Sequence, residues 1–301
     1  MIKWIISVFA FGVLFQTACM QKEDSLETLE KKIREKLAIG NTNFGVAFKD
    51  LQTGETILIN EKKHFHAAST MKTPVLLELF KQAETGKFSM DDSIAIKNSF
   101  NSIVDGSVYS LDSADDSEFE LYKNIGKKKT IASLAYEMII LSSNLATNML
   151  IELVTADSIM QTMKQLGAND IKVLRGVEDN KAYQKGLNNT TTAYDLLLIY
   201  EQMANQKLTS AAASKEMINI LLDQRFNEII PALLPKTVKV AHKTGSITGV
   251  QHDSGIVFLP DGRKYVLVLL SAFDPPDQKK VIRTMAEVSK LIYDHMQTAN
   301  P

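Results

Sequence analysis

Residues 69–80 read STMKTPVLLELF, a serine and a lysine three positions apart followed by a mostly apolar run. We expect a helix here, because Pro74 falls in the first turn, where a missing N–H is tolerated. Residues at i and i+3 lie on the same side of a helix, so the Lys72 amine would reach the Ser69 hydroxyl. An amine in that place can take the hydroxyl proton, which would make Ser69 a nucleophile at a positive helix end.

Strand patterns occur near both ends of the chain, and helical patterns lie between them. Apolar and polar residues alternate over Phe44–Lys49, Glu55–Ile59, Val238–Ser246, Ser254–Leu259 and Tyr265–Ala272. Helical spacing or capping signals mark Leu26–Ala38, Thr130–Leu141, Ala193–Ala204 and Lys279–His295.

This order predicts a two-lobed α/β (α+β) fold, in which one antiparallel sheet is built from both chain ends. The α/β lobe would comprise residues 26–66 and 206–301, and an inserted all-α lobe would comprise residues 67–205. Together they form one catalytic domain, 26–301, and the cleft between the lobes is the natural site.

The bulk composition limits the classes of partner. With 301 residues, 45% of them hydrophobic, the chain can bury a sizeable core, and its net charge of -1 gives no electrostatic drive toward nucleic acid or anionic lipid. The five histidines lack a spacing that recurs in zinc sites, so we expect no metal and no cofactor. The twelve methionines fall mostly at helical spacings and are expected in the core.

The first residues have the layout of an export signal. Lys3 precedes the apolar run 4–15, which is shorter than the ~20 residues that a membrane-spanning helix needs. We expect residues 1–18 to be a signal peptide, Cys19 to be a lipid attachment site, and residues 19–25 to be a charged tether. The protein would be periplasmic or anchored to the cell envelope through that lipid alone; ordinary secretion after cleavage nearby is the alternative.

Two further motifs follow the first in a fixed order. Ser142-Ser143-Asn144 stands about 70 residues after Ser69, and Lys243-Thr244-Gly245 about 100 residues later. Each motif alone is weak evidence, but the ordered set of three is specific. From about Leu26 to the C-terminus the chain resembles the class A serine β-lactamases, within the penicillin-recognising serine enzymes. The resemblance implies a monomer that hydrolyses β-lactam antibiotics through an acyl-enzyme and so confers resistance.

The resemblance also implies a role for each motif residue. Ser69 would attack the lactam carbonyl, and Lys72 and Ser142 would move the protons, with either Lys72 or Glu178 as the base for acylation. The backbone N–H groups of Ser69 and Ser246 would form the oxyanion hole. The substrate would be held by Asn144, Lys243, Thr244 and Gly245.

Two positions depart from the family pattern near these motifs. Ser143 stands where class A enzymes usually carry Asp. An arginine on the strand next to Lys-Thr-Gly often binds the substrate carboxylate, and counting from Lys243 its place falls at His252.

Residues 175–180, RGVEDN, match the omega loop of the family. Glu178 would activate the water that hydrolyses the acyl-enzyme, and Asp179 is a rival for this base. One extra residue separates Arg175 from Glu178, and Ala182 stands where a water-holding asparagine is usual. Asn180 and Asn188 are the candidates to replace that asparagine. Asn189 replaces an aspartate that usually pairs with the arginine.

Residues 106–129 are charged and are expected to form a solvated loop without a catalytic role. Two alternatives to a lactamase remain. A DD-peptidase or esterase on the same scaffold would keep the three motifs without a working water-activating carboxylate. A non-turnover penicillin-binding or sensor module would be acylated and remain so.

Overall fold

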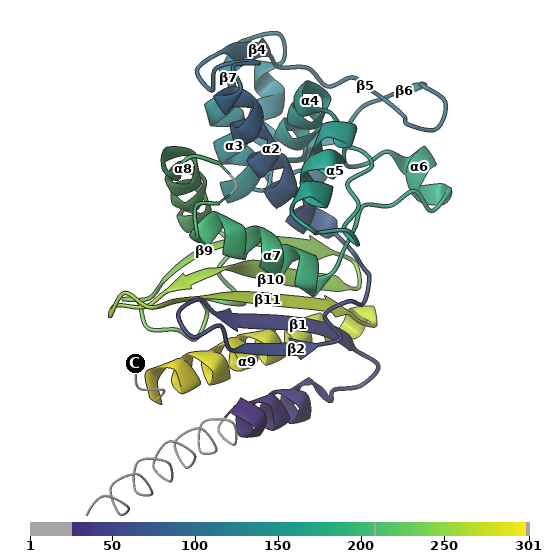
Figure 1. The fold of residues 1–301 in the computed structure, drawn as a ribbon. Coiled ribbons are helices and arrows are strands. Elements are labelled where there is room, and N and C mark those ends of the chain that lie inside the picture. Colours follow the sequence, from purple (N-terminus) through teal and green to yellow (C-terminus); the bar gives the residue numbers. More distant parts are fainter. Residues whose placement is uncertain (1–25, 208, 299–301) are drawn as a thin grey trace, which may run out of the picture.

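The computed structural model of the protein describes residues 26–207 and 209–298 (Figure 1). The signal peptide, the tether and the Cys19 lipid site predicted from the sequence lie outside these residues. Within the described part, no helix combines the length and the apolar character that crossing a membrane requires.

The predicted antiparallel sheet is confirmed and has five strands in the order β2-β1-β11-β10-β9. The N-terminal hairpin supplies β1 (Asn43–Asp50) and β2 (Thr56–Ile59). The C-terminal part supplies β9 (Lys239–Ile247), β10 (Val250–Phe258) and β11 (Lys264–Ala272). β10 begins four residues before the predicted start, because its polar residues 251–253 are buried within the strand instead of preceding it.

Helices cover both faces of the sheet (Figure 1). On one face Leu267 and Leu269 of β11 pack with residues of α9 (Gln278–Thr298) and of the helix at 26–37. On the other face the alternate residues of β11 pack with α7 (Ala193–Ala204). The period-2 alternation of β11 therefore divides the hydrophobic core into two layers. A short 3-10 turn, η4 (Pro275–Asp277), leads into α9.

The second lobe is built around α2 (Lys72–Glu84), most of which is buried. Around it lie α3 (Ile131–Ile140), α4 (Asn144–Val154), α5 (Ala156–Gln165) and α8 (Ala211–Leu222). Thr130 caps α3 as expected, since its side chain accepts a hydrogen bond from Ser133 N.

The structure differs from the sequence division in two respects. The lobe expected to be all-α also holds two two-stranded pairs, β4 (Ser93–Ala95) with β7 (Lys128–Thr130) and β5 (Phe100–Asn101) with β6 (Val108–Tyr109), and a strand, β8 (Thr190–Thr191), that pairs with β3 (Phe65–His66) of the α/β range. Strands of two or three residues are too short to show a period in the sequence. In addition, α7 was assigned to the helical lobe but lies against the sheet.

The packing of β11 yields a stability prediction. Leu267 is fully buried between the sheet and α9, so Leu267→Ala should lower the free energy of unfolding by about 2–5 kcal/mol. Leu233, which is 47% exposed, is the matched control, and Leu233→Ala should change it by less than about 0.5 kcal/mol. Urea unfolding followed by circular dichroism measures both, and equal losses would contradict this account of the core.

Candidate active site

Ser69 lies in a 3-10 turn, η1 (Ala68–Met71), that runs directly into α2. Ala68 enters this turn with φ of 44°, in the left-handed region, and its N–H donates to His66 Nδ1 at 3.1 Å. The serine is partly exposed and lines the cleft, close to the positive end of α2. Its position agrees with that expected from the sequence.

The Lys72 amine is completely buried and points away from α2 toward the loop before α4. It donates hydrogen bonds to Ser142 O at 2.7 Å, to Asn144 Oδ1 at 3.0 Å and to Ser142 Oγ at 3.2 Å. Within the described residues no hydrogen bond joins it to the Ser69 hydroxyl, so the direct contact expected from the i, i+3 spacing is not made here. Burial lowers the pKa of Lys72 to about 7, although Asp116 and Glu178 act in the opposite direction.

The Ser142 hydroxyl bridges two buried amines. Besides Lys72, it accepts a hydrogen bond from Lys243 Nζ at 3.1 Å, and Lys243 also donates to Thr244 O at 2.9 Å. Burial, and then the neighbouring Lys72, lowers the pKa of Lys243 well below its ordinary value. Ser142 has φ of 58°, a left-handed conformation that turns its side chain between the two lysines.

Strand β9 passes directly beside the serine because Gly245 has no side chain. A Cβ at this position would lie 3.1 Å from Ser69 N and 3.1 Å from Thr70 N. The next residue, Ser246, lines the same cleft as Ser69, and Thr244 lines it on the other side of the glycine. The two backbone groups expected to form an oxyanion hole therefore lie on adjoining segments.

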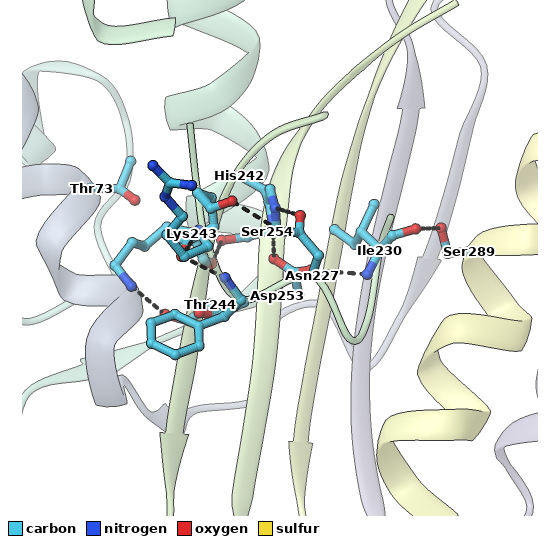
Figure 2. Close-up of polar contacts among 12 residues, drawn as sticks. Thr73, Asn227, Ile230, His242, Lys243, Thr244, Asp253, Ser254 and Ser289 are labelled. Carbon is cyan, nitrogen blue, oxygen red and sulfur yellow. Dashed lines mark hydrogen bonds and ion pairs between the residues drawn. The ribbon is translucent and has the colours of Figure 1, made fainter. Parts of the chain in front are cut away.

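A buried hydrogen-bond network connects β9 to α9 through Asp253 of β10 and through Ile230 (Figure 2). His242 Nδ1 lies 2.8 Å from Asp253 Oδ1, and Asp253 Oδ2 accepts a hydrogen bond from Ile230 N at 2.9 Å. The carbonyl of Ile230 in turn accepts from Ser289 of α9 at 2.8 Å. The Asp253 carboxylate raises the pKa of Lys243 and thus partly opposes the effects of burial and of Lys72.

His252, where counting places the family's arginine, is buried and does not line the cleft, whereas its neighbour Gln251 does. His252 is buried opposite Gly245, with Nε2 2.9 Å from His66 O, and burial lowers its pKa to about 4, so it is neutral. Gln251 pairs with Ser246 across the ladder, lines the cleft and donates from Nε2 to Ser246 Oγ at 2.6 Å.

Glu178 lies at the cleft in contact with the lysine network. Its Oε1 accepts a hydrogen bond from Asn144 Nδ2 at 2.8 Å, and Asn144 Oδ1 accepts from Lys72. Glu178 has φ of 62° and is the third non-glycine residue of the site, after Ala68 and Ser142, in the left-handed region. Burial raises the pKa of Glu178, the hydrogen bond from Asn144 lowers it, and Asp116 and Asp115 add to the increase.

Asp179, the rival base, is engaged in holding the loop together. It caps α6 (Asn180–Gln184) by accepting from Ala182 N at 3.0 Å, and it also accepts from Ser102 Oγ at 2.9 Å and Ile103 N at 3.0 Å. Burial alone would raise its pKa, but these donors and Arg175 hold it below the usual value. Asp179 therefore accepts three hydrogen bonds that fix the loop, two at Oδ1 and one at Oδ2.

The other omega-loop positions are placed as follows. Asn189 bonds to the backbone of Arg175, donating to its carbonyl at 2.9 Å, and not to the guanidinium. The guanidinium donates to Leu187 O, to Gly176 O and, at 3.4 Å, to Asn188 Oδ1. Ala182 is fully buried, and Asn180 lines the cleft.

Two polar residues of the site were missed by sequence reasoning. The first is Asn148, which is buried in α4 and clamps Val177, accepting from its N–H at 2.6 Å and donating to its carbonyl at 3.0 Å. A Cβ on Gly176 would lie 2.3 Å from Asn148 Oδ1, so only glycine fits there. The sequence signal was an asparagine within an otherwise apolar helix.

The second is Asp116, in the segment 106–129 that was expected to be solvated. Asp116 is only 7% exposed, and its Oδ2 accepts from Asn144 N and Leu145 N, each at 2.9 Å. The expectation was wrong for this residue, because its carboxylate accepts hydrogen bonds from the backbone at the N-terminus of α4 instead of facing solvent.

The cleft consists of two adjoining hollows of about 380 and 450 Å³ that share Ser69, Asn144 and Ser246. One extends toward Glu178 and the omega loop. The other extends toward Thr244, Gln251 and α9, and carries the acidic residues Asp115 and Glu228 at its rim. In the described part of the chain, no group of three or more His, Cys, Asp or Glu side chains is arranged to hold a metal ion.

The clamp on the omega loop is testable. Asn148→Ala leaves the Val177 N–H without a partner and the Val177 carbonyl with only the Tyr109 hydroxyl at 3.3 Å, so it should lower the free energy of unfolding by about 1–3 kcal/mol and speed amide exchange over residues 176–178. Hydrogen–deuterium exchange with mass spectrometry locates the effect. Asn169→Ala, which removes an exposed contact to Gly167 O, is the control; unchanged exchange in Asn148→Ala would show that this residue does not hold the loop.

Comparisons with known proteins match the sequence and the fold over most of the chain. The β-lactamase VEB-1 of Pseudomonas aeruginosa is 26% identical over 282 residues, covering 89% of this chain and 87% of that protein. A β-lactamase structure from Chitinophaga pinensis superposes with a TM-score of 0.78 at 22% identity, over 89% of this chain and 98% of that one. The structure of PBP-A gives a TM-score of 0.77 at 23% identity, over 90% and 97%. Residues 28–296 match the beta-lactamase enzyme family, and the chain belongs to that family.

Proposed function

We propose that this protein is a class A serine β-lactamase, which hydrolyses the amide bond of β-lactam antibiotics and thereby confers resistance. The observation that carries the proposal is the unbroken hydrogen-bond chain from Lys243 through Ser142, Lys72 and Asn144 to Glu178. This chain connects the groups that would transfer protons during acylation with the Glu178 carboxylate, which would activate the water that hydrolyses the acyl-enzyme.

In the acylation step, the Ser69 oxygen attacks the lactam carbonyl carbon and the ring C–N bond breaks. The proton of Ser69 passes to the neutral Lys72 amine, and a proton is delivered to the departing ring nitrogen through the Ser142 hydroxyl. A pKa of about 7 makes the neutral Lys72 amine available for this near neutral pH. The backbone N–H groups of Ser69 and Ser246 would hold the oxyanion.

In the deacylation step, a water molecule gives a proton to Glu178 and attacks the ester carbon. The ester C–O bond then breaks, the departing Ser69 oxygen takes up the proton that Glu178 received, and the opened product is released. Glu178 suits this task because it lines the cleft and is held by a single side-chain donor, Asn144. Asp179 does not suit it, because its oxygens are taken up by the loop and α6. A carboxylate in this place favours a lactamase over a DD-peptidase or a non-turnover penicillin-binding module.

The second part of the proposal concerns the location of the protein, which is inferred from its N-terminal residues. We propose that the protein is exported and attached to the cell envelope through lipid on Cys19, on the basis of the apolar run at 4–15 and the single cysteine after it.

The deacylation role is tested by Glu178→Gln. Removing the general base should slow hydrolysis of the acyl-enzyme by about 10²–10⁴-fold while leaving Ser69 reactive, so a stoichiometric adduct should accumulate. Turnover of a chromogenic cephalosporin and intact-protein mass measure the two effects, and Ser69→Ala should show neither turnover nor adduct.

The matched control is Glu35→Gln, which removes an exposed carboxylate on the helix at 26–37 and should behave as the unaltered protein. Undiminished turnover in Glu178→Gln would refute the assigned base. A lasting adduct on the unaltered protein would instead identify a penicillin-binding or sensor protein.

The carboxylate end of the cleft gives another prediction. Gln251 offers the substrate carboxylate a neutral amide, so Gln251→Arg should lower KM for benzylpenicillin about tenfold through a charge-assisted hydrogen bond. Gln251→Met, of similar length but without charge, is the control and should not lower KM. Steady-state kinetics decide the matter, and an unchanged or higher KM for the arginine variant would mean that this position does not face the carboxylate.

A further inference from the structure

Asp116 reaches the active-site turn from a separate surface segment. It follows η2 (Ser113–Asp115) and precedes η3 (Phe119–Asn124), far in sequence from the three motifs. Its side chain nevertheless lies under the turn that carries Ser142 and Asn144, at the N-terminus of α4.

Each oxygen of the Asp116 carboxylate is bound. Oδ2 accepts from Asn144 N and Leu145 N at 2.9 Å each and from Tyr122 OH at 3.0 Å, with Ser143 Oγ at 3.5 Å. Oδ1 accepts from Glu118 N at 3.0 Å, which fixes the side chain to its own segment. A buried carboxylate with this many donors holds its partners in place.

The turn that Asp116 contacts contains a residue in a strained backbone conformation. Ser142 is left-handed, and a non-glycine residue in that conformation costs about 1–2 kcal/mol. Ser143 caps α4 through its hydroxyl, which accepts from Ala146 N at 3.2 Å, and brings no charge. The carboxylate at this turn therefore comes from outside the Ser-Ser-Asn tripeptide.

We propose that Asp116 is a positioning residue of the catalytic site, which fixes the Ser142–Asn144 turn and supplies the negative charge that stabilises the Lys72 ammonium. The inference rests on the proposed β-lactamase function. Asp116 touches neither substrate nor reacting atoms in this account; it acts through Lys72, Ser142 and Asn144.

The charges around Lys72 determine the sign of the effect. Asp116 and Glu178 raise the pKa of its amine, the buried Lys243 amine lies across the Ser142 hydroxyl, and Tyr122 is the titratable group in direct contact with Asp116. Removing the Asp116 charge lowers the pKa of Lys72. More of the amine is then neutral at low pH, so acylation that needs the neutral amine persists to lower pH.

The experiment uses Glu178→Gln as background, because there the adduct accumulates and Glu178 no longer titrates. Acylation by benzylpenicillin is followed by quenched intact-protein mass between about pH 5 and pH 9. The background should show a rise in rate with an inflection at or below about pH 7, since the charge of Glu178 is gone. Adding Asp116→Asn should move the inflection down by about one pH unit and lower the plateau rate about tenfold.

Glu120→Gln in the same background is the matched control, since it removes an exposed carboxylate from the same segment and should change neither quantity. A profile for Asp116→Asn that superimposes on the background, or a lower plateau with an unmoved inflection, would overturn the proposal. If Asp116→Asn shows no cooperative thermal unfolding, Asp116→Glu replaces it; this variant keeps the charge and should keep the inflection, and a displaced inflection would overturn the proposal.

Failure of the proposed function has a different signature. In that case neither the unaltered protein nor Glu178→Gln would be modified at Ser69 by benzylpenicillin at any pH, whereas failure of the Asp116 inference leaves acylation of the background intact.

Discussion

The site depends on two lysine amines buried on either side of one hydroxyl group. Removing a cation from water is costly unless donors are satisfied and opposite charge is near. The Ser142 hydroxyl receives both Lys72 and Lys243, and its two lone pairs are then used. The buried carboxylate of Asp253 stands behind Lys243, while Asp116 and Glu178 face Lys72. The two amines therefore have different carboxylates near them, although burial lowers the pKa of both.

The arrangement also explains why the site lies between the two lobes. Ser69 and Lys72 belong to the first turns around α2, Ser142 to the loop before α4, and Lys243 to the edge strand of the sheet. No single lobe carries the whole hydrogen-bond chain. Gly245 brings the strand against the serine turn, and the contacts of Asp253 and Ile230 tie that strand back to α9. Rigid elements on both sides hold the geometry to within the tolerance that catalysis needs.

Sequence reasoning predicted the sheet, the principal helices and the positions of the motif residues, because these follow from short-range periodicity and from an ordered set of motifs. It failed where a contact is long-range. Asp116 is bonded to Asn144, 28 positions away, in a segment whose composition is typical of solvated loops. Counting along the chain also could not show that the His252 side chain is buried while that of Gln251 lines the cleft, because this depends on the register between β9 and β10. The engagement of Asp179 with Ser102 and Ile103 likewise has no local signal.

Three residues of the cleft, Ala68, Ser142 and Glu178, have positive φ values although none is glycine. Backbone strain of this kind persists only where surrounding packing enforces it. Glycine at any of them would relieve the strain, yet at two of the three it would delete the very group that the strained backbone aims into the cleft. Selection for stability and selection for catalytic activity therefore conflict at Ser142 and Glu178. Higher thermal stability has to come from substitutions elsewhere in the chain.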